Sequence, residues 1–182
     1  MVLIGIDPGS AGGIASYDTE SKEFKSTAMP KTDLDIKNYL ISFTGELIQS
    51  SEVYVLMEKV GGFIGTRKTN ILINCPYCHC LVPYQKEEGD PGSTMFKFGD
   101  GNGFLRGVCI TMGYGYETIA PRSWQKIHNI YKARGMSKTQ WKNILKDRAQ
   151  KLFPQLKVTL STADALLILD VLIRMKVSFV KN

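Results

Sequence analysis

The apolar residues of the N-terminal half fall into short runs that predict the strands of a sheet. Residues 2–6 form the first run, which ends at a turn over residues 7–10. Residues 14–17 and 23–28 continue the pattern, so two or three antiparallel strands with a glycine-rich first turn open the chain. Residues 52–57, with Val-Tyr-Val-Leu in the middle, predict a further strand that is buried.

Apolar positions three and four residues apart indicate helices in the rest of the chain. A helix that begins after Thr32 separates the first strands from the strand 52–57, and this order predicts a mixed α/β sheet. The final helix, residues 163–176, is apolar nearly all round and is therefore expected to be buried. The other predicted elements are helices over 104–112, 121–124 and 137–152 and a strand over 116–120. Residues 61–103 show neither the apolar spacing of a helix nor the apolar runs of a strand. They are therefore predicted to be irregular.

The length and composition fit one ordinary globular domain. A chain of 182 residues with 43% hydrophobic residues can bury a core of its own, which excludes a disordered tail and a miniprotein that depends on disulfides. No apolar run approaches the roughly 20 residues that cross a bilayer, and the first residues read as a strand rather than a secretion signal. Three of the four cysteines crowd within residues 75–80, unlike a disulfide framework. We therefore expect a soluble, cytoplasmic protein with no membrane partner.

Positive charge is concentrated in one segment. The chain carries a net charge of +6, and residues 121–151 contain nine Lys or Arg residues against a single acid, Asp147. A helix face that only meets solvent usually mixes both signs, so this excess favours contact with the phosphates of DNA. The two tryptophans of the segment, Trp124 and Trp141, are assigned to the core. The predicted DNA-binding residues are Arg122, Lys126, Lys132, Arg134, Lys138, Lys142 and Lys146.

Three acids stand at the ends of predicted elements. Asp7 ends the first strand, Glu58 ends the other buried strand, and Asp164 lies in the first turn of the last helix. If the two strands are neighbours, both carboxylates emerge at the same end of the sheet. Three acids converging there provide the hard oxygen ligands that a pair of divalent cations needs, with positions left open for phosphate and water. Taken singly, each acid has an ordinary reading: a turn residue, a solvated strand end, and the acid of a capping box.

Five motifs follow one another along the chain. They are Gly5-Ile6-Asp7-Pro8-Gly9-Ser10-Ala11-Gly12-Gly13-Ile14-Ala15, Leu56-Met57-Glu58-Lys59-Val60, Met95-Phe96-Lys97-Phe98-Gly99 with Gly103-Phe104-Leu105-Arg106-Gly107, Pro121-Arg122-Ser123-Trp124-Gln125-Lys126, and Ala163-Asp164-Ala165-Leu166-Leu167. Together they resemble the RuvC-like Holliday junction resolvases, especially their bacteriophage branch, over most of residues 2–64 and 93–175. The resemblance implies an RNase H-like fold, a mixed five-stranded sheet flanked by helices. It also implies two Mg²⁺ or Mn²⁺ ions per active site, a homodimer, and paired nicking of branched DNA. Asp7, Glu58 and Asp164 are then the catalytic residues and metal ligands.

The chain departs from this family at the fourth metal ligand. The family usually has an Asp or a His about three residues before the acid of the last helix, where this chain has Ser161. Asp170 is a poor substitute because it points to another side of the helix, and it is expected to pair with Arg174. A water or the Ser161 hydroxyl is the expected replacement.

A second departure is an insertion at about residues 67–91, within a single domain that spans residues 1–182. It contains Cys75-Pro76-Tyr77-Cys78-His79-Cys80, and Cys-x-x-Cys is half of a tetrahedral zinc site. Cys75 and Cys78 either bind zinc, completed by His79, Cys80 or a partner chain, or are reduced thiols in a loop. Phe63, soon after Glu58, either stacks on an opened junction or packs within the protein.

The sequence therefore predicts a Mg²⁺-dependent, structure-selective endonuclease that resolves Holliday junctions or other branched DNA by paired nicking. If the gene belongs to a phage, the protein acts in the host cytoplasm. The alternative is a catalytically weak branched-DNA-binding protein with a zinc-stapled insertion, which the missing fourth ligand and the cysteines favour.

Overall fold

The computed structural model describes residues 1–43, 52–61, 67–88 and 92–178. The chain divides into two compact units, one made of Met1–Val60 and Gly101–Asn182 and the other of Gly61–Asp100. The elements of the first unit are β1 (Val2–Asp7), β2 (Gly13–Asp18), β3 (Phe24–Ala28), α1 (Asp33–Ile41), β4 (Val53–Glu58), β7 (Gly115–Ile119), α3 (Pro121–Ile127), α4 (Lys138–Leu152) and α5 (Ala163–Ser178). The second unit contains β5 (Arg67–Asn74), β6 (Leu81–Glu88) and the start of α2 (Gly92–Thr111).

A five-stranded sheet in the order β3-β2-β1-β4-β7 forms the centre of the first unit. β1 pairs antiparallel with β2 and parallel with β4, and β4 pairs parallel with β7. β1 lies in the middle and all six of its residues are buried, which explains its continuous apolar run. The predicted mixed five-stranded sheet is therefore confirmed.

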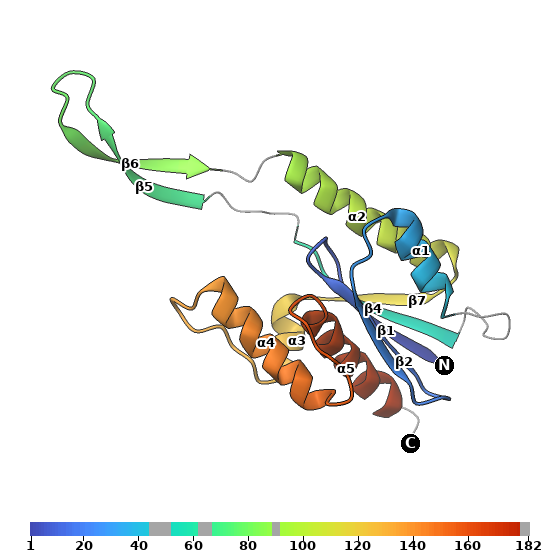
Figure 1. The fold of residues 1–182 in the computed structure, drawn as a ribbon. Helices are drawn as coiled ribbons and strands as arrows, with labels where there is room; N and C mark the ends of the chain where they lie inside the picture. Colours follow the sequence, from blue (N-terminus) through green and yellow to red (C-terminus); the bar gives the residue numbers. More distant parts are fainter. Residues whose placement is uncertain (44–51, 62–66, 89–91, 179–182) are drawn as a thin grey trace. The chain divides into compact units, whose positions relative to one another are not determined.

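Helices cover both faces of this sheet (Figure 1). One core cluster joins the sheet to α3, α4 and α5 around the fully buried Trp124 and Leu166. The other cluster joins it to α1 and the second half of α2 around Ile4, Leu40 and Leu105. α5 lies directly on β1, with no room between them for a side chain at Gly5. A Cβ atom at Gly5 would lie 2.4 Å from the backbone oxygen of Ala165. This close packing fixes the start of α5 against the central strand.

Local signals placed most of these elements correctly. Thr32 caps α1 as predicted, and its side chain accepts a hydrogen bond from the backbone nitrogen of Asp35. α1 ends at Ile41, with Ser42 as its C-cap. Ser137 and Gln140 form a capping box at the start of α4, and α5 is buried along most of its length.

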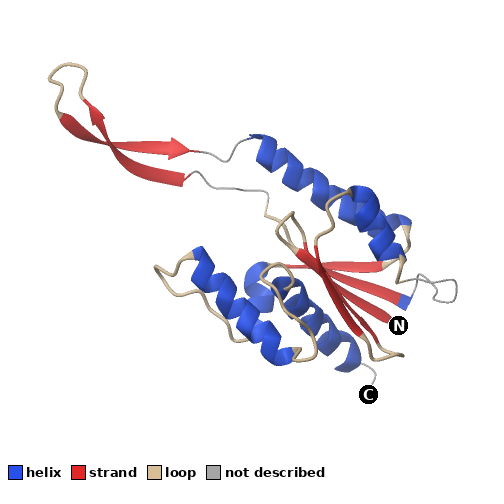
Figure 2. Ribbon diagram, viewed as in Figure 1, coloured by secondary structure: helices blue, strands red, loops and turns tan. Residues whose placement is uncertain are grey.

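The prediction that residues 61–103 are irregular is wrong (Figure 2). β5 and β6 form an antiparallel hairpin in register from Arg67 and Glu88 to Asn74 and Leu81, and α2 begins at Gly92 rather than at residue 104. The hairpin has little buried surface, since even Leu72 is 63% exposed, so its strands carry no alternation that a sequence pattern could reveal. The glycines of α2 lower its helix propensity and concealed its first half.

No helix within the described residues has the length and apolar character needed to span a membrane.

Candidate active site

Asp7 and Glu58 lie at the same end of two adjacent strands. β1 and β4 run parallel in a register that pairs Ile6 with Met57, and Asp7 and Glu58 are the last residues of their strands. α5, which lies on β1, brings Asp164 in its first turn to the same place. The three acids that the sequence singled out are therefore gathered by the sheet order and by the packing of α5.

The three carboxylates influence one another through burial and charge. Burial, together with the charges of Asp164 and Glu58, raises the pKa of Asp7 to about 7 against the lowering effect of Lys142. The pKa of Glu58 is raised chiefly by burial, and the pKa of Asp164 is raised by burial against the lowering effect of Lys142. The site therefore concentrates negative charge where water cannot screen it, and a bound cation would relieve that repulsion.

Lys142 belongs to this site as well as to the basic segment. Its ammonium group on α4 donates a hydrogen bond to the carboxylate of Asp164, with Nζ 2.7 Å from Oδ2. The sequence placed Lys142 on the DNA-facing surface only, and that role stays a prediction. The ion pair joins residues 22 positions apart, so no local pattern signals it. Its effect is to neutralise part of the charge of the acids and to hold Asp164 in a fixed orientation.

Trp124 contacts one of the three acids, which no sequence pattern indicated. It is fully buried, as predicted, but its indole Nε1 donates a hydrogen bond to Oε2 of Glu58 at 2.7 Å. α3 carries it there, opened by Pro121 at its first position. A buried tryptophan usually needs a hydrogen-bond acceptor for its N–H. This requirement is the only feature of the sequence that could have indicated a polar partner for Trp124. The contact fixes one carboxylate oxygen of Glu58.

The glycine-rich turn after β1 closes tightly over Asp7. A Cβ atom at Gly12 would lie 2.0 Å from the backbone oxygen of Asp7 and 3.1 Å from its Cγ. Gly9 adopts a φ of 114°, a conformation that other residues rarely reach. Both glycines therefore allow the tight turn that positions Asp7.

The three acids have the chemistry of ligands for a divalent metal ion, but their side chains are not arranged around one. In the described part of the chain, no group of three or more acids, histidines or cysteines is placed so as to hold a metal ion, and Lys142 supplies positive charge at Asp164 instead. However, Oδ1 of Asp164 is buried and has no hydrogen-bond partner, which is costly unless a ligand satisfies it. A cation at this oxygen would satisfy it, and its positive charge would oppose the rise in the pKa of Asp7. Three carboxylates offer the oxygen ligands that Mg²⁺ and Mn²⁺ favour.

The structure accounts for Asp170 without a metal. As predicted, Asp170 pairs with Arg174, with the carboxylate Oδ2 2.6 Å from Nε. Ser161 is partly exposed ahead of α5, and its role in a metal site stays a prediction.

Most of the predicted DNA-binding residues lie on the surface formed by α3, the segment after it and α4. Arg122, Lys126 and Lys132 line one cavity of about 590 Å³ together with Tyr131 and Trp141. Arg134 lines a neighbouring cavity of about 590 Å³. Lys138 is exposed and Lys146 is half-buried on α4. Phe63 lies outside the described residues.

The cysteines of the hairpin lie close to one another at its turn. The Sγ atoms of Cys78 and Cys80 are 2.7 Å apart and share a hydrogen bond, and hydrogen bonds from Cys80 and Cys75 lower the pKa of the Cys78 thiol. All four cysteines of the chain are free thiols. Zinc binding by Cys75 and Cys78 stays a prediction.

Comparisons with known proteins support the fold. No protein-family profile matches the chain, and no curated protein matches it either. Among solved structures, the chain is similar to T. thermophilus RuvC in complex with a Holliday junction substrate, with a TM-score of 0.53 and 13% identity over 97% of each chain. Another Thermus thermophilus RuvC structure aligns with a TM-score of 0.46 and 16% identity over 93% of this chain and 91% of the other. The chain thus has the RNase H-like fold of RuvC.

Proposed function

We propose that the protein is a Mg²⁺- or Mn²⁺-dependent endonuclease that resolves Holliday junctions or other branched DNA. The observation that carries this proposal is the convergence of Asp7, Glu58 and Asp164 at one end of the sheet, with a buried oxygen of Asp164 left unpaired. The likeness of the fold to a RuvC bound to a Holliday junction supports DNA as the substrate. Paired nicking needs two active sites, so we propose a homodimer.

Asp7, Glu58 and Asp164 would hold the metal ions, two per active site. Ions held there would activate the attacking water and would stabilise the negative charge that develops on the leaving oxygen of the phosphodiester. The protein's own residues orient the ligands: Trp124 holds one oxygen of Glu58, and Lys142 holds one oxygen of Asp164 while the other stays free. Fixing the carboxylates in this way reduces the reorganisation that the reaction requires.

A nicking assay on a labelled four-way junction, with and without Mg²⁺, tests the proposal. We expect cuts at symmetry-related positions of two opposing strands only when the metal is present. A second candidate is a branched-DNA-binding protein with weak or no catalysis, which Ser161 at the usual fourth-ligand position favours. Tight junction binding without metal-dependent cutting would support that candidate and contradict the first.

Replacing Trp124 tests the orientation of Glu58. Trp124→Phe keeps an aromatic ring in the core but removes the hydrogen bond to Oε2, and loss of a group that orients a metal ligand costs about 10- to 100-fold in activity or metal affinity. We expect a fall of this size in cutting with unchanged junction affinity. Trp141→Phe, at another buried tryptophan, is the matched control. Equal losses in both variants would show that Trp124 acts only through packing.

The basic surface predicts a steep salt dependence of junction binding. On a log–log plot, each phosphate that is neutralised contributes a slope of about −0.9. Lys138→Ala with Lys146→Ala is expected to flatten the slope by up to about two, while Lys142 stays in place to hold Asp164. Lys31→Ala with Lys37→Ala, which removes the same charge at and before α1 on the other face of the sheet, should leave the slope unchanged. Equal slopes for the native protein and both double variants would show that the DNA does not contact this face of α4.

A further inference from the structure

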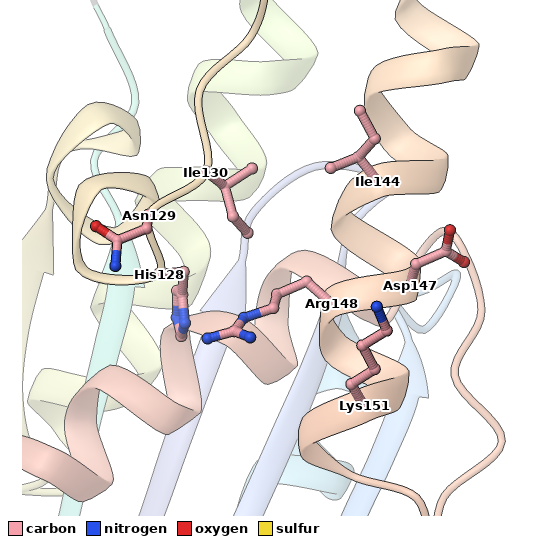
Figure 3. Close-up of a pocket in the computed structure, with 7 residues that line it drawn as sticks. All are labelled: His128, Asn129, Ile130, Ile144, Asp147, Arg148 and Lys151. Carbon is pink, nitrogen blue, oxygen red and sulfur yellow. The ribbon is translucent and has the colours of Figure 1, made fainter.

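A cavity apart from the three acids lies between the segment after α3 and one side of α4 (Figure 3). It has a volume of about 510 Å³ and is lined by residues 128–130 and by four residues of α4. None of the catalytic acids, and none of the residues predicted to bind DNA, lines it. The proposed nuclease reaction therefore leaves this cavity without a role.

Two buried polar atoms in its wall have no hydrogen-bond partner. Nε2 of His128 is 2.9 Å from the backbone oxygen of Leu167, and because a carbonyl can only accept, Nε2 carries the hydrogen. Nδ1 of His128 is left without a partner, although the residue is only 3% exposed. Nε of Arg148 is likewise buried and unpaired. Figure 3 shows the guanidinium of Arg148 extending toward His128, so both unsatisfied groups meet on one side of the cavity.

Of the two unpaired atoms, only Nε of Arg148, a donor, would be satisfied by an anion, because Nδ1 of His128 is an acceptor. Asp170 faces Nδ1 of His128 from α5 at 3.8 Å, but Arg174 already binds the same carboxylate oxygen at 2.6 Å. Burial lowers the pKa of His128, as do the charges of Arg174 and Arg148, while Asp170 and the Leu167 carbonyl oppose them. The ring is therefore neutral at pH 7, and Arg148 lacks an acceptor for its Nε–H. An oxyanion would provide that acceptor.

The charged residues of the cavity wall are two cations and one acid. Arg148 and Lys151 line it together with Asp147. The charged side chains that line the cavity therefore carry a net charge of +1.

The cavity also adjoins the basic surface. Ile130 lines both this cavity and the one that contains Arg122, Lys126 and Lys132. Ile144 lines both this cavity and the one that contains Arg134. A polyanion that follows the basic residues therefore passes the mouth of the cavity, whereas a small free anion would gain nothing from those neighbours.

We propose that this cavity binds a backbone phosphate of a DNA arm, held by Arg148 and Lys151. This inference rests on the proposed function, because it assumes that the substrate is DNA. It adds a phosphate contact away from the cutting site, of the kind that fixes the position of a duplex without reading its sequence.

Histidine NMR signals provide a direct test of occupancy. The chain has two histidines, and His79 lies in the hairpin of the second unit, so it serves as an internal control. Titration with a short unbranched duplex should move the ring signals of His128 and leave those of His79 in place. A second titration uses inorganic phosphate in place of the duplex and follows the same ring signals. A shift with phosphate but none with the duplex would mean a site for free anions and would overturn the proposal.

Binding to a four-way junction, measured against salt in Ca²⁺ so that cutting does not interfere, is the second test. Arg148→Gln with Lys151→Gln should flatten the log–log slope by about 0.9, because both side chains share one phosphate. Loss of Arg148 could impair folding, so Lys151→Gln alone, at an exposed position, is tested as well. This single variant should also bind the junction more weakly than the native protein. Lys31→Gln with Lys37→Gln is the matched control.

The outcomes separate this inference from the proposed function. If the native protein binds and cuts junctions but the Arg148 and Lys151 variants match the control in slope and affinity, the cavity site is wrong and the nuclease stands. If the protein binds duplex through the cavity but never cuts with Mg²⁺ or Mn²⁺, the nuclease is wrong and the cavity site stands.

Discussion

Asp7→Asn is expected to reduce Mg²⁺-dependent cutting of a four-way junction by more than about 100-fold, which exceeds the usual cost of losing a group that only orients a metal ligand. The amide keeps the shape of the side chain but removes the negative charge that a divalent cation requires. Junction affinity should be retained or slightly increased, because the basic surface of α3 and α4 is untouched and one negative charge near the DNA is gone.

Asp33→Asn is the matched control for this prediction. It makes the same chemical change at an exposed position in the first turn of α1, and it should cut at the native rate. Gel-based nicking and equilibrium binding on the same labelled junction measure both quantities. Near-native cutting by Asp7→Asn would remove Asp7 from the active site, and loss of binding together with cutting would indicate a folding defect instead.

The metal-free protein is expected to lose stability as the pH rises from about 4 to about 7. Burial raises the pKa of Asp7 from 3.8 to about 7 in the folded protein, so in this window the folded state holds a proton that the unfolded state has released. Stability then falls with increasing pH. One pKa unit corresponds to about 1.4 kcal/mol, so the Asp7 contribution is on the order of 4 kcal/mol. The raised pKa values of Glu58 and Asp164 act in the same direction.

Urea unfolding in a chelator at several pH values measures this effect. Asp7→Asn should lose the Asp7 part of the pH dependence and be more stable than the native protein at pH 7 and above. Mg²⁺ or Mn²⁺ should restore stability to the native protein near neutral pH, by about 2.7 kcal/mol at 100 times the dissociation constant. The restoration should grow with pH, since the ligands must be deprotonated. A stability that rises with pH in the chelator would show that Asp7 is not held at a raised pKa.

The sequence by itself determined the strands and helices that carry the site. β1 and β4 are short apolar runs, α1 and α4 show a helical period and a cap, and α5 is apolar nearly all round, because each of these elements is buried in the core on at least one face. The same patterns put Asp7 and Glu58 at strand ends and Asp164 in a first helical turn. The order of these elements predicts a mixed α/β sheet, but that β1 and β4 are neighbours was only a condition of the predicted site, and the structure supplies it.

The hairpin β5–β6 could not be predicted in this way. Its strands have little buried surface, so no constraint acts on which residues are apolar, and pattern reading has nothing to detect.

Only the tertiary structure decided which side chains meet across the site. The contacts of Trp124 with Glu58 and of Lys142 with Asp164 join residues 66 and 22 positions apart, and the cavity beside His128 is enclosed by segments that no periodicity connects. Such contacts depend on how α3, α4 and α5 pack on the sheet, which the chain specifies through its whole core rather than through any local motif. The residue types were readable from the sequence, but the pairing of a buried charge or N–H with its partner is a property of the folded packing.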